Sequence, residues 1–163
     1  MLLEPPSRPD LTAALKKHRC LLTIDLTRAV VDEAISRNTS FIITYHPIIF
    51  SGLKSITTAN SQQESLLRLA QAGIAVYSLH TSVDAAPGGL GDWLAAGVAG
   101  GKGAESKPIT PVTVSTGIEG GMGKIVELND AVSFDELVQR VKAFLGLERV
   151  SVAVSERHRG QEG

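Results

Sequence analysis

The chain has 163 residues, enough for one domain or for a domain with a smaller addition, and its formal net charge is -1. With 16 Lys and Arg against 17 Asp and Glu, it lacks the basic excess that nucleic-acid and membrane-surface binders carry. The single cysteine excludes an intramolecular disulfide, and no apolar run approaches the roughly 20 residues that span a bilayer. We therefore expect a cytoplasmic protein with neither nucleic-acid nor membrane partners.

The first part of the chain has the pattern of alternating strands and helices. Residues 1–18 predict an extended lead-in, because they contain three prolines and no apolar periodicity. Short apolar runs predict three strands, at residues 20–24, 41–45 and 75–79. The first run is nearly continuous, which is typical of a strand covered on both faces. Helical spacing predicts helices between the strands, at residues 28–37 and 61–72, so we expect parallel β-α-β units with right-handed crossovers.

The second part of the chain changes character and predicts a smaller α+β segment. The predicted segments are an α/β domain at residues 19–100 that ends with a short helix, a flexible glycine-rich loop at 101–110, a β-β-α-β segment at 111–154 and a polar tail at 155–163. Ser133 begins a capping box before the one helix of the β-β-α-β segment, whose last strand is expected at residues 150–154. The predicted fold class is α/β, a largely parallel sheet with flanking helices followed by this smaller segment.

Polar side chains follow each of the three early strands. Asp25 follows the first strand, Tyr45 and His46 end the second, and His80 and Asp84 follow the third. Because the carboxyl ends of parallel strands share one edge of the sheet, we expect these side chains to converge there. Pro47 holds His46 in extended geometry. An imidazole and a carboxylate in one pocket suit Zn²⁺, Fe²⁺ or Mn²⁺, which take mixed nitrogen and oxygen ligands.

Each of these residues also has a simpler interpretation. His46 can end a strand with a hydrogen bond to the backbone, and Asp84 can be a turn residue that bonds its own backbone. Asp25 can be a helix-start acid that the helix dipole favours. His80 can be a hydrogen-bonding neighbour of a site rather than a ligand. Only their common position on the predicted edge favours a site.

The same residues belong to a longer ordered series of motifs. The series consists of Asp25-Leu26-Thr27, Tyr45-His46-Pro47-Ile48-Ile49-Phe50, Tyr77-Ser78-Leu79-His80-Thr81 and Asp84-Ala85-Ala86-Pro87-Gly88-Gly89. It resembles the Nif-three-like family (NGG-one-interacting factor three), whose bacterial members are often labelled GTP cyclohydrolase 1 type 2. The resemblance implies an α/β fold in two related halves, a homo-oligomeric assembly and a dinuclear metal site. It also implies that His46 and Asp84 are metal ligands, with His80 in a recurrent position near the site.

Two departures from the family pattern weaken the expected site. Tyr45 stands where many members have a histidine, and a neutral phenol is a poor metal ligand. The family's remaining His and Glu ligands come from a C-terminal half that this sequence does not contain, so we interpret it as a fragment or a truncated gene product. The divalent metal, of the zinc, iron or manganese class, is then expected to be weakly bound or absent.

Three functional hypotheses follow from this inventory. The first is a binding or regulatory protein of this family, with a protein partner and little or no activity in this form. The alternative is a metal-dependent hydrolase of the GTP cyclohydrolase 1 type 2 kind. The third is a plain α/β domain whose polar edge residues only cap helices.

Overall fold

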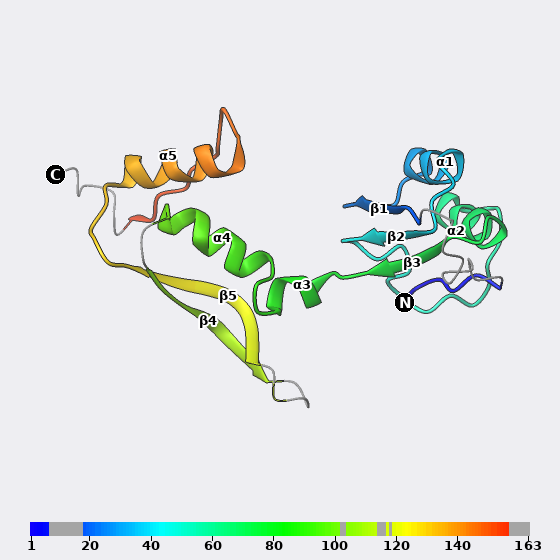
Figure 1. Cartoon of the computed structure of the whole chain (residues 1–163), viewed down its shortest axis with the longest axis horizontal. Coiled ribbons are helices and arrows are strands. Elements are labelled where there is room, and N and C mark those ends of the chain that lie inside the picture. The colour runs from blue at the N-terminus through cyan, green and yellow to red at the C-terminus, as the bar shows by residue number, and fades with distance from the viewer. Residues whose placement is uncertain (7–17, 102–103, 114–116, 118, 157–163) are drawn as a thin grey trace. The chain divides into compact units, whose positions relative to one another are not determined.

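The computed structural model in Figure 1 describes residues 1–6, 18–101, 104–113, 117 and 119–156. The chain divides into two compact units, which we call unit 1 (Met1–Val83) and unit 2 (Asp84–Gly163). The sequence placed this boundary after residue 100, because the short helix near residue 95 follows the third strand. That helix instead packs against elements that come later in the chain.

Unit 1 contains the parallel sheet that the sequence predicts. Its strands are β1 (Cys20–Thr23), β2 (Phe41–Thr44) and β3 (Ala75–Ser78), in the order β1-β2-β3. Both pairings are parallel and in register, so that Leu21 faces Ile42 and Ile42 faces Val76. The predicted fold class is therefore confirmed in this unit. Part of the predicted lead-in, residues 7–17, lies outside the described residues, while Leu3 forms an antiparallel bridge with Val76.

Two helices cover one face of this sheet (Figure 1). They are α1 (Arg28–Ser36) and α2 (Ser61–Gln71), whose N-caps Thr27 and Asn60 accept hydrogen bonds from backbone amides of the first turn. Right-handed crossovers between strands that advance in one direction place both helices on the same face. The core between them and the sheet consists of Leu26, Val31, Ala34, Ile42, Leu69, Ile74 and Val76.

The opposite face of the sheet is not covered in the way that the sequence predicts. Leu22 and Ile24 are 73% and 64% exposed, and Tyr77 is also exposed. The expectation of strands covered on both faces is therefore wrong for β1. Burial on both faces needs helices on both sides, and two sequential right-handed crossovers supply only one side.

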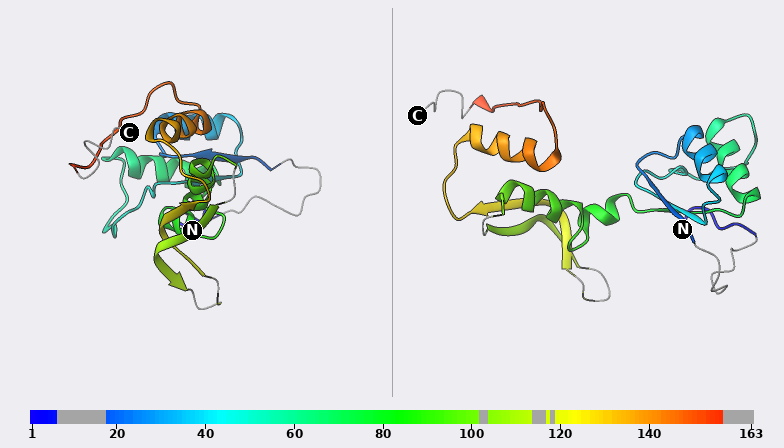
Figure 2. Two further views of the ribbon diagram at one scale, coloured as in Figure 1. Left: turned by 90° about the vertical axis from the view of Figure 1, so that its left-hand side faces the viewer. Right: turned by 45° about the horizontal axis from the view of Figure 1, so that its top comes forward.

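Unit 2 is built around the helix α4 (Leu90–Ala99). This helix lies between a two-stranded antiparallel hairpin, β4 (Ala104–Thr113) with β5 (Glu119–Leu128), and the helix α5 (Phe134–Leu145), as Figures 1 and 2 show. The short helix α3 (Thr81–Ala85) precedes α4 in the chain. The contact between α4 and α5 is close, because a Cβ added at Gly97 would lie 2.3 Å from the ring of Phe144. Small residues on α4 thus permit dense packing.

Two sequence predictions for this unit are wrong. The predicted loop at residues 101–110 is largely strand, since β4 begins at Ala104 and contains Pro108 and Pro111. In a two-stranded hairpin each strand is an edge strand, where proline is tolerated. The last strand expected at residues 150–154 does not form among the described residues. An apolar run forms a strand only when a second segment supplies backbone partners in register.

One detail of the sequence prediction for this unit holds. Ser133 caps α5 by accepting a hydrogen bond from the Glu136 amide at 3.2 Å, as the capping box predicts. None of the described helices has the length and apolar composition needed to cross a bilayer.

The carboxylate of Asp92 ties the start of α4 to β5. It accepts a hydrogen bond from the Gly88 amide at 2.7 Å and pairs with the ammonium group of Lys124. The Lys124 hydrogen bond, and then that of Gly88, lower the pKa of Asp92 below its ordinary value of 3.8. Because the folded-state pKa is depressed, the stability from this group is present above that ordinary pKa. It is lost as the pH falls through the folded-state pKa.

Replacing this carboxylate by the neutral amide in Asp92→Asn is expected to destabilise unit 2 at pH 7 by about 1–2 kcal/mol. The loss of stability below about pH 4 should also become shallower. Urea titrations followed by the fluorescence of Trp93, the only tryptophan of the chain, measure both effects. Asp130→Asn, in an exposed bend, is the matched control. Identical pH profiles for Asp92→Asn and wild type would contradict the assignment.

Candidate functional site

The carboxyl ends of the three parallel strands bring polar side chains to one edge of unit 1. Backbone hydrogen bonding of the sheet continues past the strand ends, where the amide of His46 donates to Ile24 and the amide of His80 donates to Tyr45, both at 3.0 Å. The structure therefore brings together four of the five predicted site residues: Asp25, Tyr45, His46 and His80. These four residues lie close together at the edge where the strand topology predicts them.

A hydrogen bond joins His46 and Asp25 at this edge. The Nδ1 atom of His46 lies 2.8 Å from Oδ1 of Asp25, and the two side chains are 51% and 65% exposed. Because an ionised carboxylate only accepts hydrogen bonds, the imidazole donates from Nδ1. In a neutral ring the lone pair is then on Nε2. This contact is additional to the helix-start interpretation of Asp25, and the residue that caps α1 is Thr27.

The backbone around His46 is fixed by a buried hydroxyl that the sequence analysis missed. Thr44 is fully buried, and its Oγ1 lies 3.0 Å from the carbonyl oxygen of Ile24 and 2.9 Å from that of His46. Its one proton is shared between these two carbonyl oxygens, which lie just beyond the ends of β1 and β2. The signal in the sequence was Thr44 itself, a polar residue at a strand position that faces the core. The hydroxyl stabilises the junction from which His46 extends.

Aromatic rings surround His80. The centroid of its ring lies 5.9 Å from that of Tyr45, 6.2 Å from that of His46 and 6.1 Å from that of Phe50. Its backbone is in the left-handed region, with φ of 39°, which non-glycine residues adopt at a cost. The carbonyl of His80 accepts the Val83 amide at 3.1 Å, so the unusual backbone turns the chain from β3 into α3.

A pocket of about 430 Å³ lies beside the His46–Asp25 pair. It is lined by Asp25, Leu26, Thr27, Arg28, His46, Pro47, Ser61, Gln62 and Ser65. These residues come from the end of β1, the end of β2 and the first turns of α1 and α2. Hydroxyl, amide and guanidinium groups therefore share this space with the imidazole.

Asp84, the fifth predicted residue, lies in α3 at the beginning of unit 2, four positions after His80. Its pairing with His46 stays a prediction. Within the described residues, no group of three or more His, Cys, Asp or Glu side chains is placed to hold a metal ion. Unit 1 by itself contributes the His46 imidazole with its Asp25 carboxylate partner, together with the neighbouring rings.

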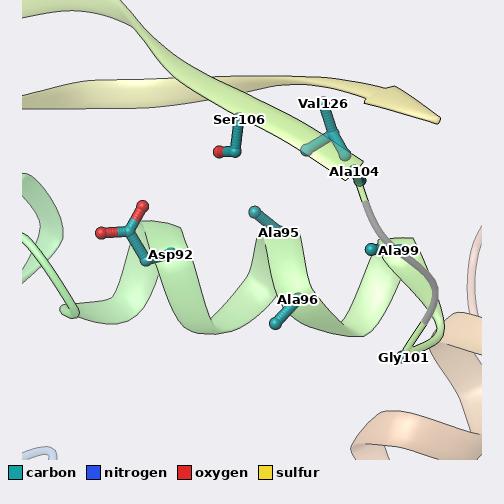
Figure 3. A pocket seen from close by; sticks show the side chains of 8 residues that line it. All are labelled: Asp92, Ala95, Ala96, Ala99, Gly101, Ala104, Ser106 and Val126. Atoms are coloured by element: carbon teal, nitrogen blue, oxygen red, sulfur yellow. The ribbon is translucent and has the colours of Figure 1, made fainter. Parts of the chain in front are cut away.

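A second pocket, of about 410 Å³, lies within unit 2 between α4 and the β4–β5 hairpin (Figure 3). It is lined by Asp92, Ala95, Ala96, Ala99, Gly101, Ala104, Ser106 and Val126. Figure 3 shows the polar side chains, Asp92 and Ser106, near one end of a row of alanines. This pocket was not predicted from the sequence, in which the small residues of α4 were its signal. The carboxylate of Asp92 is already paired with Lys124, so the pocket offers little chemistry of its own.

Comparison with known proteins identifies the family. The model of the family described as Duf34/NIF3 (NGG1p interacting factor 3) matches residues 12–161. The "Protein NIF3 homolog" of Schizosaccharomyces pombe is 52% identical over 136 residues, which cover 81% of this chain and 48% of that protein. The "NGG1-interacting factor 3" of Saccharomyces cerevisiae is 40% identical over 84% of this chain and 48% of its own length. A "GTP cyclohydrolase 1 type 2 homolog" of Lactococcus lactis is 31% identical, over 88% and 52%.

One solved structure agrees with this assignment. A Bacillus cereus protein related to NIF3 is 36% identical and superimposes with a TM-score of 0.51, over 58% of this chain and 26% of that one. The chain spans about half the length of the curated relatives it matches. The family match, the relatives and the ordered motifs around His46 lead to one conclusion: this chain belongs to the DUF34/NIF3 family.

Proposed function

We propose that this chain is a binding or regulatory protein that contributes part of a divalent-metal site, with His46 as its imidazole ligand and Asp84 as a carboxylate ligand. The observation that supports the proposal most is the hydrogen bond from His46 Nδ1 to Asp25. Metal-bound histidines usually donate their other ring nitrogen to a carboxylate or a carbonyl group, so this side chain fits the role.

The donor set favours binding over catalysis. His46 and Asp84 are two protein ligands, whereas catalytic zinc sites usually have three, so the affinity for a metal of the zinc, iron or manganese class should be low. When bound, such a metal would polarise or activate a water molecule. Tyr45 and His80 pack against the ring of His46 and restrict its orientation.

The names of two relatives support different functions. The S. cerevisiae relative is called an interacting factor, which favours a protein partner for this chain. The L. lactis relative is called a GTP cyclohydrolase 1 type 2 homolog, which favours the alternative, a metal-dependent hydrolase. The alternative needs more ligands than His46 and Asp84. Homo-oligomer formation and a cytoplasmic location stay predictions.

Metal titration of the purified chain tests the proposal. With Zn²⁺ or Mn²⁺ added, we expect at most one weakly held ion per chain, no GTP turnover, and a loss of affinity of at least about tenfold in His46→Ala. His18→Ala, at an exposed histidine outside this edge, should bind as wild type does. Two ions per chain with GTP turnover that His46→Ala abolishes would overturn the proposal in favour of the hydrolase. Equal affinity in wild type and His46→Ala would overturn the metal role.

A further inference from the structure

We propose that Asp25 is a positioning residue that holds His46 in the tautomer with hydrogen on Nδ1. This inference rests on the proposed metal role of His46. The ring can present Nε2 to a metal only when the lone pair is on that nitrogen, and the Asp25 carboxylate selects this state. Asp25 touches no metal in this scheme and acts through the imidazole alone.

The geometry of the pair supports the assignment. The 2.8 Å separation of Nδ1 and Oδ1 is that of a charge-assisted hydrogen bond between a ring N–H and a carboxylate. A neutral imidazole has one donor and one acceptor nitrogen, so donation from Nδ1 leaves Nε2 as the acceptor. A free imidazole side chain prefers the opposite tautomer, with hydrogen on Nε2. The carboxylate is therefore needed to reverse the ordinary preference of His46.

Both members of the pair stand on fixed backbone. The amide of His46 donates to Ile24 at 3.0 Å, which ties the end of β2 to the residue before Asp25. The carbonyl of Asp25 accepts hydrogen bonds from the Thr23 hydroxyl at 2.9 Å and from the Thr27 amide at 3.1 Å. The backbone that carries the carboxylate is thus set by the turn between β1 and α1.

A purely structural role for the Asp25 side chain does not account for its position. The first turn of α1 already has a cap, since Thr27 Oγ1 accepts the hydrogen bond of the Val30 amide. The carboxylate is 65% exposed and accepts its hydrogen bond from the ring of His46. An exposed pair of this kind contributes little to stability, typically below about 1 kcal/mol. The effect of this hydrogen bond is instead to select the tautomer of the His46 imidazole.

The test compares the tautomer of His46 in three proteins. Long-range ¹⁵N–¹H correlation spectra of the metal-free chain at about pH 8.5, well above the pKa of a free imidazole, identify which ring nitrogen carries the hydrogen. We expect Nδ1–H in wild type and mainly Nε2–H in Asp25→Ala. Asp25→Asn retains an oxygen acceptor and should restore Nδ1–H. The signals of His18 and His80 serve as internal references.

Zn²⁺ titration of the same three proteins separates this inference from the proposed function. Asp25→Ala should lower the affinity about 10–100-fold, and Asp25→Asn should stay within a few-fold of wild type. An unchanged tautomer in Asp25→Ala overturns the inference, as does an unchanged affinity in a wild type that binds zinc. A third outcome is that the tautomer changes in Asp25→Ala but the wild-type chain binds no zinc. The tautomer change would support the positioning of the His46 ring by Asp25, and the missing zinc binding would overturn the proposed metal role. Amide spectra that match wild type show that the variants are folded.

Discussion

Replacing Leu69 with alanine is expected to lower the free energy of unfolding of unit 1 by about 2–5 kcal/mol. Leu69 is fully buried in α2 and belongs to the cluster that joins both helices to the sheet. Truncation removes apolar area from the core and leaves a cavity, because Ile42 and Val76 are held by the strand pairing and move little. A loss of this size is a large fraction of the stability of a small domain.

The matched control for this change is Leu67→Ala, the same substitution two positions earlier on the same helix. Leu67 is 39% exposed, so its truncation should cost less than about 1 kcal/mol. Hydrogen–deuterium exchange of the β2 amides reports on unit 1 directly, because these amides are protected by the parallel pairing. If the two variants exchange at the same rate, Leu69 does not have the central position in the core that its burial indicates.

Adding a methyl group in Gly120→Ala is expected to destabilise unit 2 by about 2–3 kcal/mol. A Cβ at this position of β5 would lie 2.2 Å from the carbonyl oxygen of Ala85 and 3.4 Å from Cδ of Pro87. The first of these is a backbone atom, so the clash is relieved only if a whole segment moves. The close approach of two backbones explains why glycine is present in the strand.

Urea unfolding followed by Trp93 fluorescence measures this effect, because Trp93 packs against Phe144 in the same unit, with ring centroids 4.6 Å apart. Gly52→Ala is the comparison, since no described atom lies within 4 Å of a Cβ built there. Because Gly52 lies in unit 1, this variant should leave the stability of unit 2 that Trp93 reports within about 0.5 kcal/mol of wild type. Unfolding of Gly120→Ala at the wild-type urea concentration would show that the contact with Ala85 adjusts without cost.

Much of the site was accessible from the sequence because it follows from topology. Once residues 20–24, 41–45 and 75–79 are assigned as parallel strands, their carboxyl ends must share an edge, and the polar residues beyond them must meet there. The structure confirms this for His46 and its neighbours on the edge. Strand topology does not place Asp84 beside His46 in the same way, because Asp84 lies in α3, beyond the end of β3 and in the other unit.

The role of Asp25 shows where sequence reasoning was insufficient. An acid three residues before the first residue of a helix is favoured by the helix dipole wherever it occurs, so the local pattern alone suggested a helix-start residue. The contact with His46 joins residues 21 positions apart and depends on the register of β1 and β2. Local propensity contains no information about such a register.

The sequence by itself determined the strands of unit 1, their parallel order and the family, because short apolar runs, helix caps and ordered motifs are local features of a chain. Only the tertiary structure decided which sheet face is covered, that Pro108 and Pro111 lie inside β4, and that Asp25 bonds to the imidazole of His46. Burial, strand pairing and side-chain hydrogen bonds each require a partner from elsewhere in the chain. Such partners are set by crossover handedness and strand register.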